Sequence, residues 1–103
     1  MAQTLIANTT SAAQSAAIVV PDGKKCTVQM TGTYTASEYA DIQYYAAGTA
    51  VDLYEGGSQQ RLSTTNKAAH VNGPITFRID KDATVSAAGV EIEYDKISGV
   101  TVG

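Results

Sequence analysis

The chain has 103 residues and a net charge of −3, with 44% apolar residues, 17% charged residues and a single cysteine. A chain of this length can bury one core but not two, so the sequence predicts one domain. The charged fraction lies below the usual value of about 25%, and Thr, Ser, Ala, Gly and Gln take its place, which suits a surface that packs against other proteins. The basic residues are scattered apart from the pair Lys24-Lys25, so no basic stripe is available for nucleic-acid phosphates.

Membrane insertion and export are not expected from this sequence. No apolar run approaches the length of about 18 residues that a transmembrane helix needs. The first ten residues, MAQTLIANTT, lack the basic start and the apolar stretch of a secretory signal. Cys26 has no second cysteine with which to form an internal disulfide, which fits a reducing cytoplasm.

Residues 1–17 form a segment with few large apolar side chains, of which Leu5 and Ile6 are the main ones. Its only helix-like run is SAAQSAA at Ser11–Ala17, which is shorter than the ~12–15 residues of even a marginal isolated helix. Two interpretations stay open. The segment is an N-terminal arm that becomes ordered on a partner and contributes little to the fold, or it is an edge strand of the domain.

Residues 18–103 are predicted to form a single β domain. Strand patterns occur at Ala17–Val20, Lys24–Thr31, Tyr39–Ala46 and Thr49–Glu55, with turns at Pro21-Asp22-Gly23, Gly48 and Gly56-Gly57. Weaker patterns follow at Ser58–Ser63, Thr64–Val71 and around Val85, and clear alternation returns at Ile75–Asp80 and Val90–Tyr94, with a last short strand or tail at Ile97–Val102.

About seven or eight short strands with turns every eight to twelve residues predict an all-β fold, a small antiparallel β-sandwich or barrel. The phase of the alternation predicts which side chains face inward. The expected core is Val28, Met30, Ile42, Val51, Leu53, Ile75, Phe77, Ile79, Val90 and Ile92.

The residue types that carry catalysis or bind metals are sparse. His70 is the single histidine, and a Cys–His site would require Cys26 to approach it in space, whereas the alternation places Cys26 on an apolar strand face. Asp80 and Asp82 suggest a calcium turn, but they lack the full pattern of calcium loops, so a solvated turn is favoured. We therefore expect no enzymatic activity, no cofactor and no metal.

Six tyrosines are the most suggestive feature of the composition. Tyrosine is enriched at protein interfaces because it is apolar with one polar end, although it also fills cores and stacks on sugars. By alternation, Tyr39, Tyr45 and Tyr54 face away from the core. Together with Leu5 and Ile6 they are the candidate interface residues.

Two stretches carry a resemblance to a protein family. They are VQMTGTYTASEYADIQYYAAGTAVDLYEGG at residues 28–57 and VNGPITFRIDKDATVSAAGVEI at residues 71–92. Their order of features, a strand ending at glycine, a second strand, a Gly-Gly hairpin, a Gly-Pro break and a glycine-led last strand, resembles small virion proteins of tailed bacteriophages.

The resemblance implies a virion structural protein, a capsid decoration or cementing protein that binds the lattice of the major capsid protein and is assembled in the host cytoplasm. Other virion proteins, or further copies of the chain, are implied partners as well. The alternative is a receptor- or glycan-binding module of a head fibre or tail. The family offers no catalytic motif, so no site residue carries over.

Overall fold

The computed structural model describes residues 2–93 and 100–102, and this part of the chain is all β, without a helix. Accordingly, none of it forms a helix of the length and hydrophobicity required to span a membrane. The strands are β1 (Ala2–Thr9), β2 (Ala13–Gln14), β3 (Ile18–Val20), β4 (Lys25–Gly32), β5 (Ala40–Ala46), β6 (Thr49–Asp52), β7 (Tyr54–Glu55), β8 (Ser58–Gln59), β9 (Arg61–Leu62), β10 (Ala68–Asn72), β11 (Ile75–Lys81), β12 (Ala88–Glu93) and β13 (Thr101–Val102).

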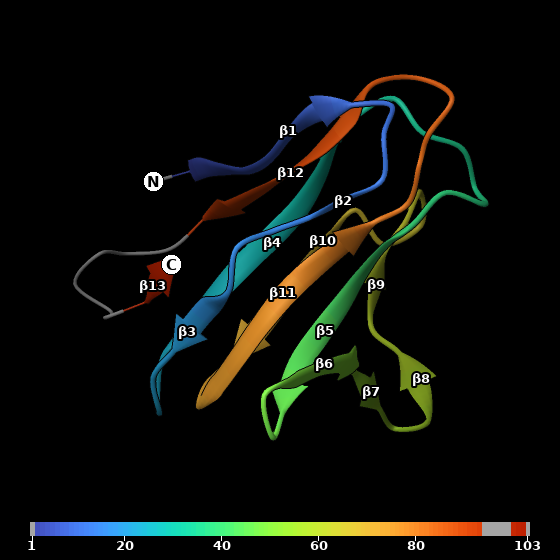
Figure 1. The fold of residues 1–103 in the computed structure, drawn as a ribbon. Helices are drawn as coiled ribbons and strands as arrows, with labels where there is room; N and C mark the ends of the chain where they lie inside the picture. The colour runs from blue at the N-terminus through green and yellow to red at the C-terminus, as the bar shows by residue number, and fades with distance from the viewer. Residues whose placement is uncertain (1, 94–99, 103) are drawn as a thin grey trace.

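The strands form two antiparallel sheets that pack face to face as a sandwich (Figure 1). Sheet A has the order β1-β12-β4-β10, and sheet B has the order β13-β3-β11-β5-β6, with β2 also pairing with β11 and β9 also pairing with β5. A small hairpin of β7 and β8 stands apart from both sheets. The prediction of an all-β fold, a small antiparallel β-sandwich or barrel, is confirmed.

The core lies between the sheets, and the predicted alternation places it correctly in most strands. In β4 the burial pattern alternates from Lys25 to Thr31, and the buried residues of β12 face those of β11 and β5 across the interior. The buried hydrophobic residues are Ile6, Ile18, Val20, Cys26, Val28, Met30, Ala40, Ile42, Leu62, Val71, Phe77, Ile79, Ala88, Val90, Ile92 and Val100.

One inward assignment is wrong, and two others are met only in part. Val51 is 36% exposed because β6 is the edge strand of sheet B, outside the buried layer. Leu53 and Ile75 are only partly buried against the core. No strand forms at Val85, which is largely exposed on the loop between β11 and β12. Tyr94, the last residue of the strand predicted at Val90–Tyr94, lies outside the described residues.

The N-terminal segment is paired along much of its length, which corrects the interpretation of it as an independent arm. β1 pairs with β12 at the edge of sheet A, and β2 pairs with β11. Ile6 is only 7% exposed and belongs to the core. Because β12 supplies a hydrogen-bonding ladder and the core takes up Ile6, the cost of ordering this segment is offset within the domain.

Gly89 explains how β1 sits against β12. The pairing shifts register between Ile6 and Thr9, and a side chain at Gly89 would collide with the backbone of Ile6 and with Asn8. The missing side chain lets Asn8 reach across β12, where its Oδ1 accepts a hydrogen bond from the Thr31 hydroxyl at 3.0 Å.

Lys81, at the end of β11, is fully buried, which the sequence did not suggest. Its Nζ donates to Ser11 O at 2.9 Å and to Asp82 O at 3.0 Å, and it lies 3.4 Å from the Thr84 hydroxyl. Burial lowers the pKa of Lys81, while the nearby carboxylates of Glu38 and Asp82 oppose this change. The ammonium therefore joins the turn after β1 to the loop after β11.

Glu38 ties a third segment to the same end of the sandwich. Its two carboxylate oxygens accept hydrogen bonds from Thr35 N at 2.7 Å and from Val85 N at 2.8 Å. The hydrogen bonds from these two backbone N–H groups lower the pKa of the Glu38 carboxyl, and the bond from Thr35 has the larger effect. We call Lys81, Glu38 and Thr84 the Lys81 cluster. We call the end of the sandwich that this cluster joins together the closed end.

The first prediction tests whether β1 belongs to the fold. Ile6→Ala should lower the free energy of unfolding by roughly 2–5 kcal/mol, because it removes a buried aliphatic side chain. Thr4→Ala, at an exposed position of the same strand, should change it by no more than about 0.5 kcal/mol. Urea denaturation of both variants measures the difference, and equal midpoints would restore the arm interpretation.

The second prediction concerns the acid stability of the closed end. A carboxyl whose pKa is lowered by folding contributes stability above its unfolded pKa, and this contribution is lost as the pH falls through the folded value. Glu38→Gln should therefore melt below the wild type at pH 7, and the gap should shrink as the pH falls below about 4.3. Thermal melts between pH 7 and pH 3 give the comparison, with Glu93→Gln as an exposed control. A gap that is unchanged at pH 3 would show that the Glu38 charge is not the cause.

Candidate functional site

Strand β5 changes its partner at Ile42, and this creates a projecting hairpin. Leu53 N donates to Ile42 O at 2.9 Å, and Ile42 N donates to Gln60 O at 3.0 Å. Gln60 N also donates to Leu53 O at 2.8 Å, which closes the base of the β7–β8 hairpin. Gly56 and Gly57 have φ values of 59° and 84°, the left-handed conformations of a two-residue hairpin turn, and the hairpin extends from the lower end of the sandwich in Figure 1.

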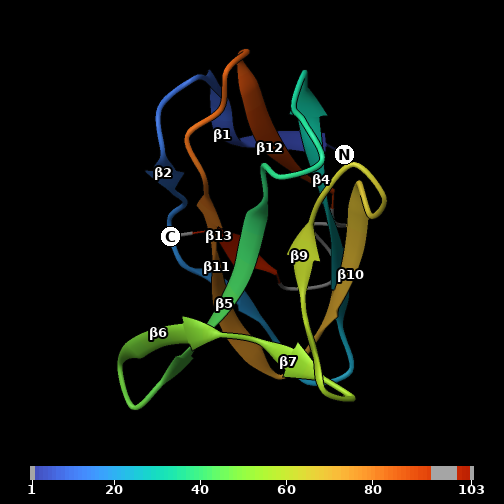
Figure 2. The same ribbon diagram turned by 90° about the vertical axis from the view of Figure 1, so that its right-hand side faces the viewer.

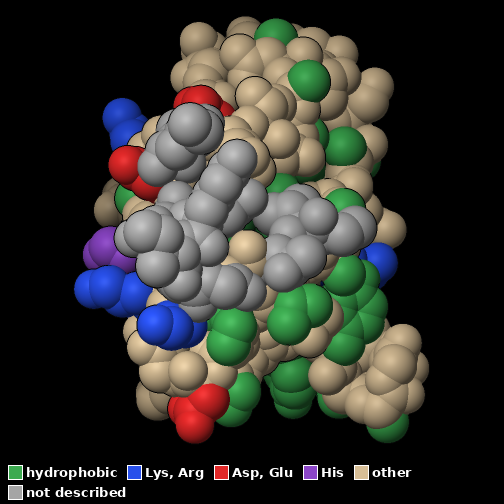
Figure 3. Space-filling view, turned by 90° about the vertical axis from the view of Figure 1, so that its left-hand side faces the viewer, with side chains coloured by type: hydrophobic (Ala, Val, Ile, Leu, Met, Phe, Trp, Pro, Cys, Tyr) green, Lys and Arg blue, Asp and Glu red, His purple; other side chains and the backbone are tan. Residues whose placement is uncertain are grey.

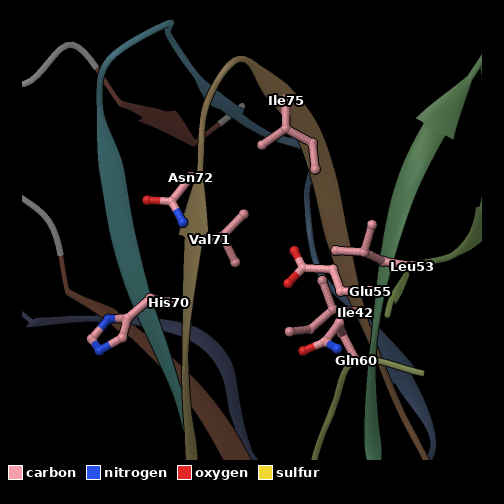
Figure 4. Close-up of a pocket in the computed structure, with 8 residues that line it drawn as sticks. All are labelled: Ile42, Leu53, Glu55, Gln60, His70, Val71, Asn72 and Ile75. Carbon is pink, nitrogen blue, oxygen red and sulfur yellow. The ribbon is translucent and has the colours of Figure 1, made fainter. Parts of the chain in front are cut away.

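A small cleft of about 70 Å³ lies between this hairpin and β10 (Figure 4). Four aliphatic side chains form its apolar lining, and four polar residues complete it. The aliphatic residues are Ile42, Leu53, Val71 and Ile75, and the polar residues are Glu55, Gln60, His70 and Asn72. Because Ile75 begins β11 and Lys81 ends it, the cleft lies at the opposite end of the sandwich from the Lys81 cluster.

The pairing of β10 with β4 decides where Cys26 and His70 lie. Val71 is opposite Cys26, and both face the core, whereas His70 is opposite Thr27 on the outer face of sheet A. The His70 ring points away from the cleft in Figure 4, and its Nδ1 lies 2.8 Å from the Thr27 hydroxyl. The two side chains therefore lie on opposite faces of the sheet, and no Cys–His site forms.

Strand β10 is the edge of sheet A on the side of the cleft, next to β9 (Figure 2). Met30 N donates to Lys67 O at 2.9 Å, and Gly73 N donates to Lys24 O at 2.8 Å, so every second residue of this segment bonds to β4. The backbone groups of the intervening residues, Ala68, His70 and Asn72, therefore point to the free edge. We call the β7–β8 hairpin, the cleft and this edge the open end.

The predicted interface residues are divided among three surfaces. Tyr54 lies on the β7–β8 hairpin and is 59% exposed. Tyr39 and Tyr45 lie on the outer side of sheet B, each partly buried, and the Arg61 guanidinium is 4.3 Å from the Tyr39 ring centre. On β1, Leu5 packs partly against the core and Ile6 is inside it, so Ile6 is not a surface contact.

The polar side chains on the outer face of sheet B are largely bonded to one another. Arg78 Nε donates to Gln43 Oε1 at 2.8 Å, and Gln43 Nε2 donates to Asp52 Oδ1 at 3.0 Å. Arg61 Nε lies 3.1 Å from Asp41 Oδ1. Burial raises the pKa of Asp41, and Arg61 partly offsets this rise. This face therefore offers a partner few uncommitted polar groups.

The less favoured alternative at Asp80 and Asp82, a calcium turn, does not gather ligands in the described part of the chain. Asp82 Oδ2 accepts a hydrogen bond from Tyr39 N at 3.1 Å. Asp80 stands opposite Asp41 in the pairing of β11 with β5. Within residues 2–93 and 100–102, no group of three or more His, Cys, Asp or Glu residues is arranged to hold a metal ion.

Sequence reasoning gave only a weak strand pattern at Thr64–Val71, and it predicted neither the sheet edge at β10 nor the lysines beside that edge. Residues 68–72, AAHVN, carry only one large apolar side chain, so their alternation is faint. The pair Lys24-Lys25 was visible, but its position beside β10 depends on a pairing between strands more than forty residues apart in sequence.

One solved structure has the same fold, whereas no protein-family model and no curated protein matches the chain. The crystal structure of the SPBc2 prophage-derived protein YomS superposes with a TM-score of 0.67 and 14% sequence identity. The alignment covers 100% of this chain and 92% of that chain. At this low identity the likeness shows a shared fold alone.

The third prediction follows from the position of Cys26. Burial raises the pKa of its thiol to about 11, so at pH 8 roughly one thiol in a thousand is the reactive thiolate. Labelling with iodoacetamide should therefore be very slow in the native protein and complete within minutes in 6 M guanidinium chloride, as followed by mass spectrometry. Rapid native labelling would contradict the burial of this strand face.

Proposed function

We propose that the chain is a phage virion structural protein that decorates the head by binding the lattice of the major capsid protein. The observation that carries this proposal is the full-length similarity of its fold to a prophage-derived protein. The resemblance of residues 28–57 and 71–92 to small virion proteins supports it from the sequence.

The open end is the surface we assign to this binding. Tyr54 offers an exposed aromatic side chain on a hairpin whose base is fixed by hydrogen bonds to Ile42. Exposed aromatic side chains beside an apolar cleft are typical anchors of protein interfaces. On a repeating capsid lattice, many such contacts of modest strength add up through multivalency. We assign no reaction and no cofactor to this surface.

The alternative is a receptor- or glycan-binding module of a head fibre or tail, and a second groove favours it. This groove, of about 390 Å³, is lined by Thr4, Asn8, Thr31 and Glu91, together with Ile6 and Ala7. Hydroxyl, amide and carboxylate groups of this kind can bond to the hydroxyl groups of a sugar. Among the described residues, no aromatic side chain lines the groove to stack on a sugar ring, so decoration remains the first proposal.

The fourth prediction is the copy number in particles. Quantitative mass spectrometry of purified phage particles, with electron microscopy to locate the protein, should find on the order of hundreds of copies on the head. A few copies at a fibre or tail would favour the alternative, and absence from the particles would overturn both proposals.

Two tyrosine variants test which surface binds. Tyr54→Ala should reduce the occupancy of particles without lowering the melting temperature, because this side chain is largely exposed. Tyr45→Ala, on the outer face of sheet B, is the matched control and should leave occupancy unchanged. Loss of occupancy only with Tyr45→Ala would move the binding surface to sheet B.

A further inference from the structure

The two edges of sheet A differ in how well they can accept another strand. At β1, the pairing with β12 shifts register twice, and such irregularities hinder the addition of a further strand. At β10, five consecutive residues pair with β4 in unbroken register. Within the described residues, the backbone groups of Ala68, His70 and Asn72 on its outer side have no hydrogen-bonding partner.

The uncommitted positive charges of the described chain gather beside this edge. Arg61, Arg78 and Lys81 are bonded to other side chains or to the backbone, and Lys96 lies outside the described residues. The other basic residues are Lys24, Lys25 and Lys67, which are exposed and whose ammonium groups have no bonded partner among the described residues.

These lysines flank both ends of β10. Lys25 is opposite Asn72 in the pairing, Lys24 O accepts from Gly73 N, and Lys67 immediately precedes the strand. Figure 3 shows positively charged side chains directly below the histidine at one margin of the molecule and another further above it, with acidic side chains between that one and the histidine. The carboxylates on the outer face of this sheet, Glu91 and Glu93, belong to β12, on the other side of β4. An acidic segment along β10 would therefore meet positive charge first.

The cleft also restricts which side chains an added strand can direct toward it. Its aliphatic lining, which includes Val71 and Leu53, and its volume of about 70 Å³ suit one small aliphatic side chain. Glu55 lines the same cleft, so an acidic side chain pointing inward would be repelled. Because successive side chains of a strand point to opposite faces, an acceptable segment alternates aliphatic and acidic residues.

A second copy of the chain is a poor occupant of this edge. Antiparallel pairing of two β10 strands about His70 would set the two imidazoles side by side. It would also bring Lys67 of each copy to the end of the other strand, where Lys24 and Lys25 lie. Like charges in direct apposition disfavour such pairing, and lysines at an edge are a common protection against it.

We infer that the free edge of β10 accepts an extended, acidic segment of a partner protein as an added strand, with one aliphatic side chain of that segment seated in the cleft. Main-chain hydrogen bonds from Ala68, His70 and Asn72 would hold the segment, and Lys25 and Lys67 would select its charge. The inference rests on the proposed function in one respect, namely that the partner is a protein. Beyond this, it specifies the chemistry of the segment that binds.

The fifth prediction uses a defined probe. The peptide acetyl-Thr-Asp-Val-Asp-Val-Asp-Thr-amide should bind the full chain at least tenfold more tightly than the matched peptide with lysine in place of aspartate, and its affinity should fall as salt is added. Nuclear magnetic resonance titration measures both affinities. Hydrogen exchange at the amides of Ala68, His70 and Asn72 should slow when the acidic peptide is bound.

Two pairs of variants separate strand pairing from simple charge attraction. His70→Pro removes an outward N–H at an edge position where proline is tolerated, and should weaken binding at least tenfold, whereas His70→Ala keeps that N–H and should weaken it no more than about threefold. Lys25→Glu combined with Lys67→Glu should reverse the preference between the two peptides, which tests the inference even if His70→Pro fails to fold.

Several results would overturn the inference. Equal binding of both peptides, or no slowing of exchange at the β10 amides, would exclude an acidic added strand. Sedimentation showing a dimer with these amides already protected would assign the edge to a second copy. If the protein is present in particles but does not bind the acidic peptide, this inference is wrong and the virion assignment stands. If the protein binds the peptide but is absent from particles, only the virion assignment is wrong.

Discussion

The buried ammonium of Lys81 is the interaction on which the arrangement of this sandwich depends. A charge without solvent exposure is strongly unfavourable unless hydrogen bonds replace its water shell, and here Ser11 O and Asp82 O do so. These acceptors belong to segments that are about seventy residues apart in sequence, so the end of β11 can be buried only when both segments are in place. Glu38 adds a third segment through its bonds to Thr35 and Val85. The closed end therefore forms as one unit, and the cleft beside the β7–β8 hairpin lies at the opposite end.

The strands that the sequence predicts well are those in which alternation and burial coincide. In Lys25–Gly32 and Ile75–Lys81 about every second side chain packs against the facing sheet. The alternation of apolar and polar residues in the sequence therefore corresponds directly to burial in the structure. The same reasoning fails at Val51, where alternation continues after the strand has left the buried layer. It fails in the opposite direction at Lys81, because a lysine within a polar run carries no signal that its ammonium will bond to Ser11 O, seventy residues away in sequence. β1 was equally ambiguous, because its contribution depends on Gly89, more than eighty residues away.

The candidate site was less predictable than the fold, and for a related reason. Composition identified exposed tyrosines, and Tyr54 does stand on a projecting hairpin, whose Gly56-Gly57 turn was readable from sequence. The cleft behind that hairpin arises from Ile42 bonding to both Leu53 and Gln60, a change of partner that no local pattern encodes. The edge strand β10 is similar, because AAHVN has the composition of a loop and becomes a strand only through its pairing with β4. Features that depend on long-range pairing are those that a single sequence hides.

The lysines beside β10 can serve two purposes with one arrangement. An unprotected edge strand invites pairing with any exposed strand, including the same edge of another copy, and positive charge at both ends makes that self-pairing repulsive. The same charge favours a partner that carries the opposite sign, so protection and selection come from a single set of side chains. Charge alone would not fix the register of such a partner, because lysine side chains are long and flexible. The cleft supplies that missing constraint, since one aliphatic side chain can enter it only when the added strand lies in register with Val71.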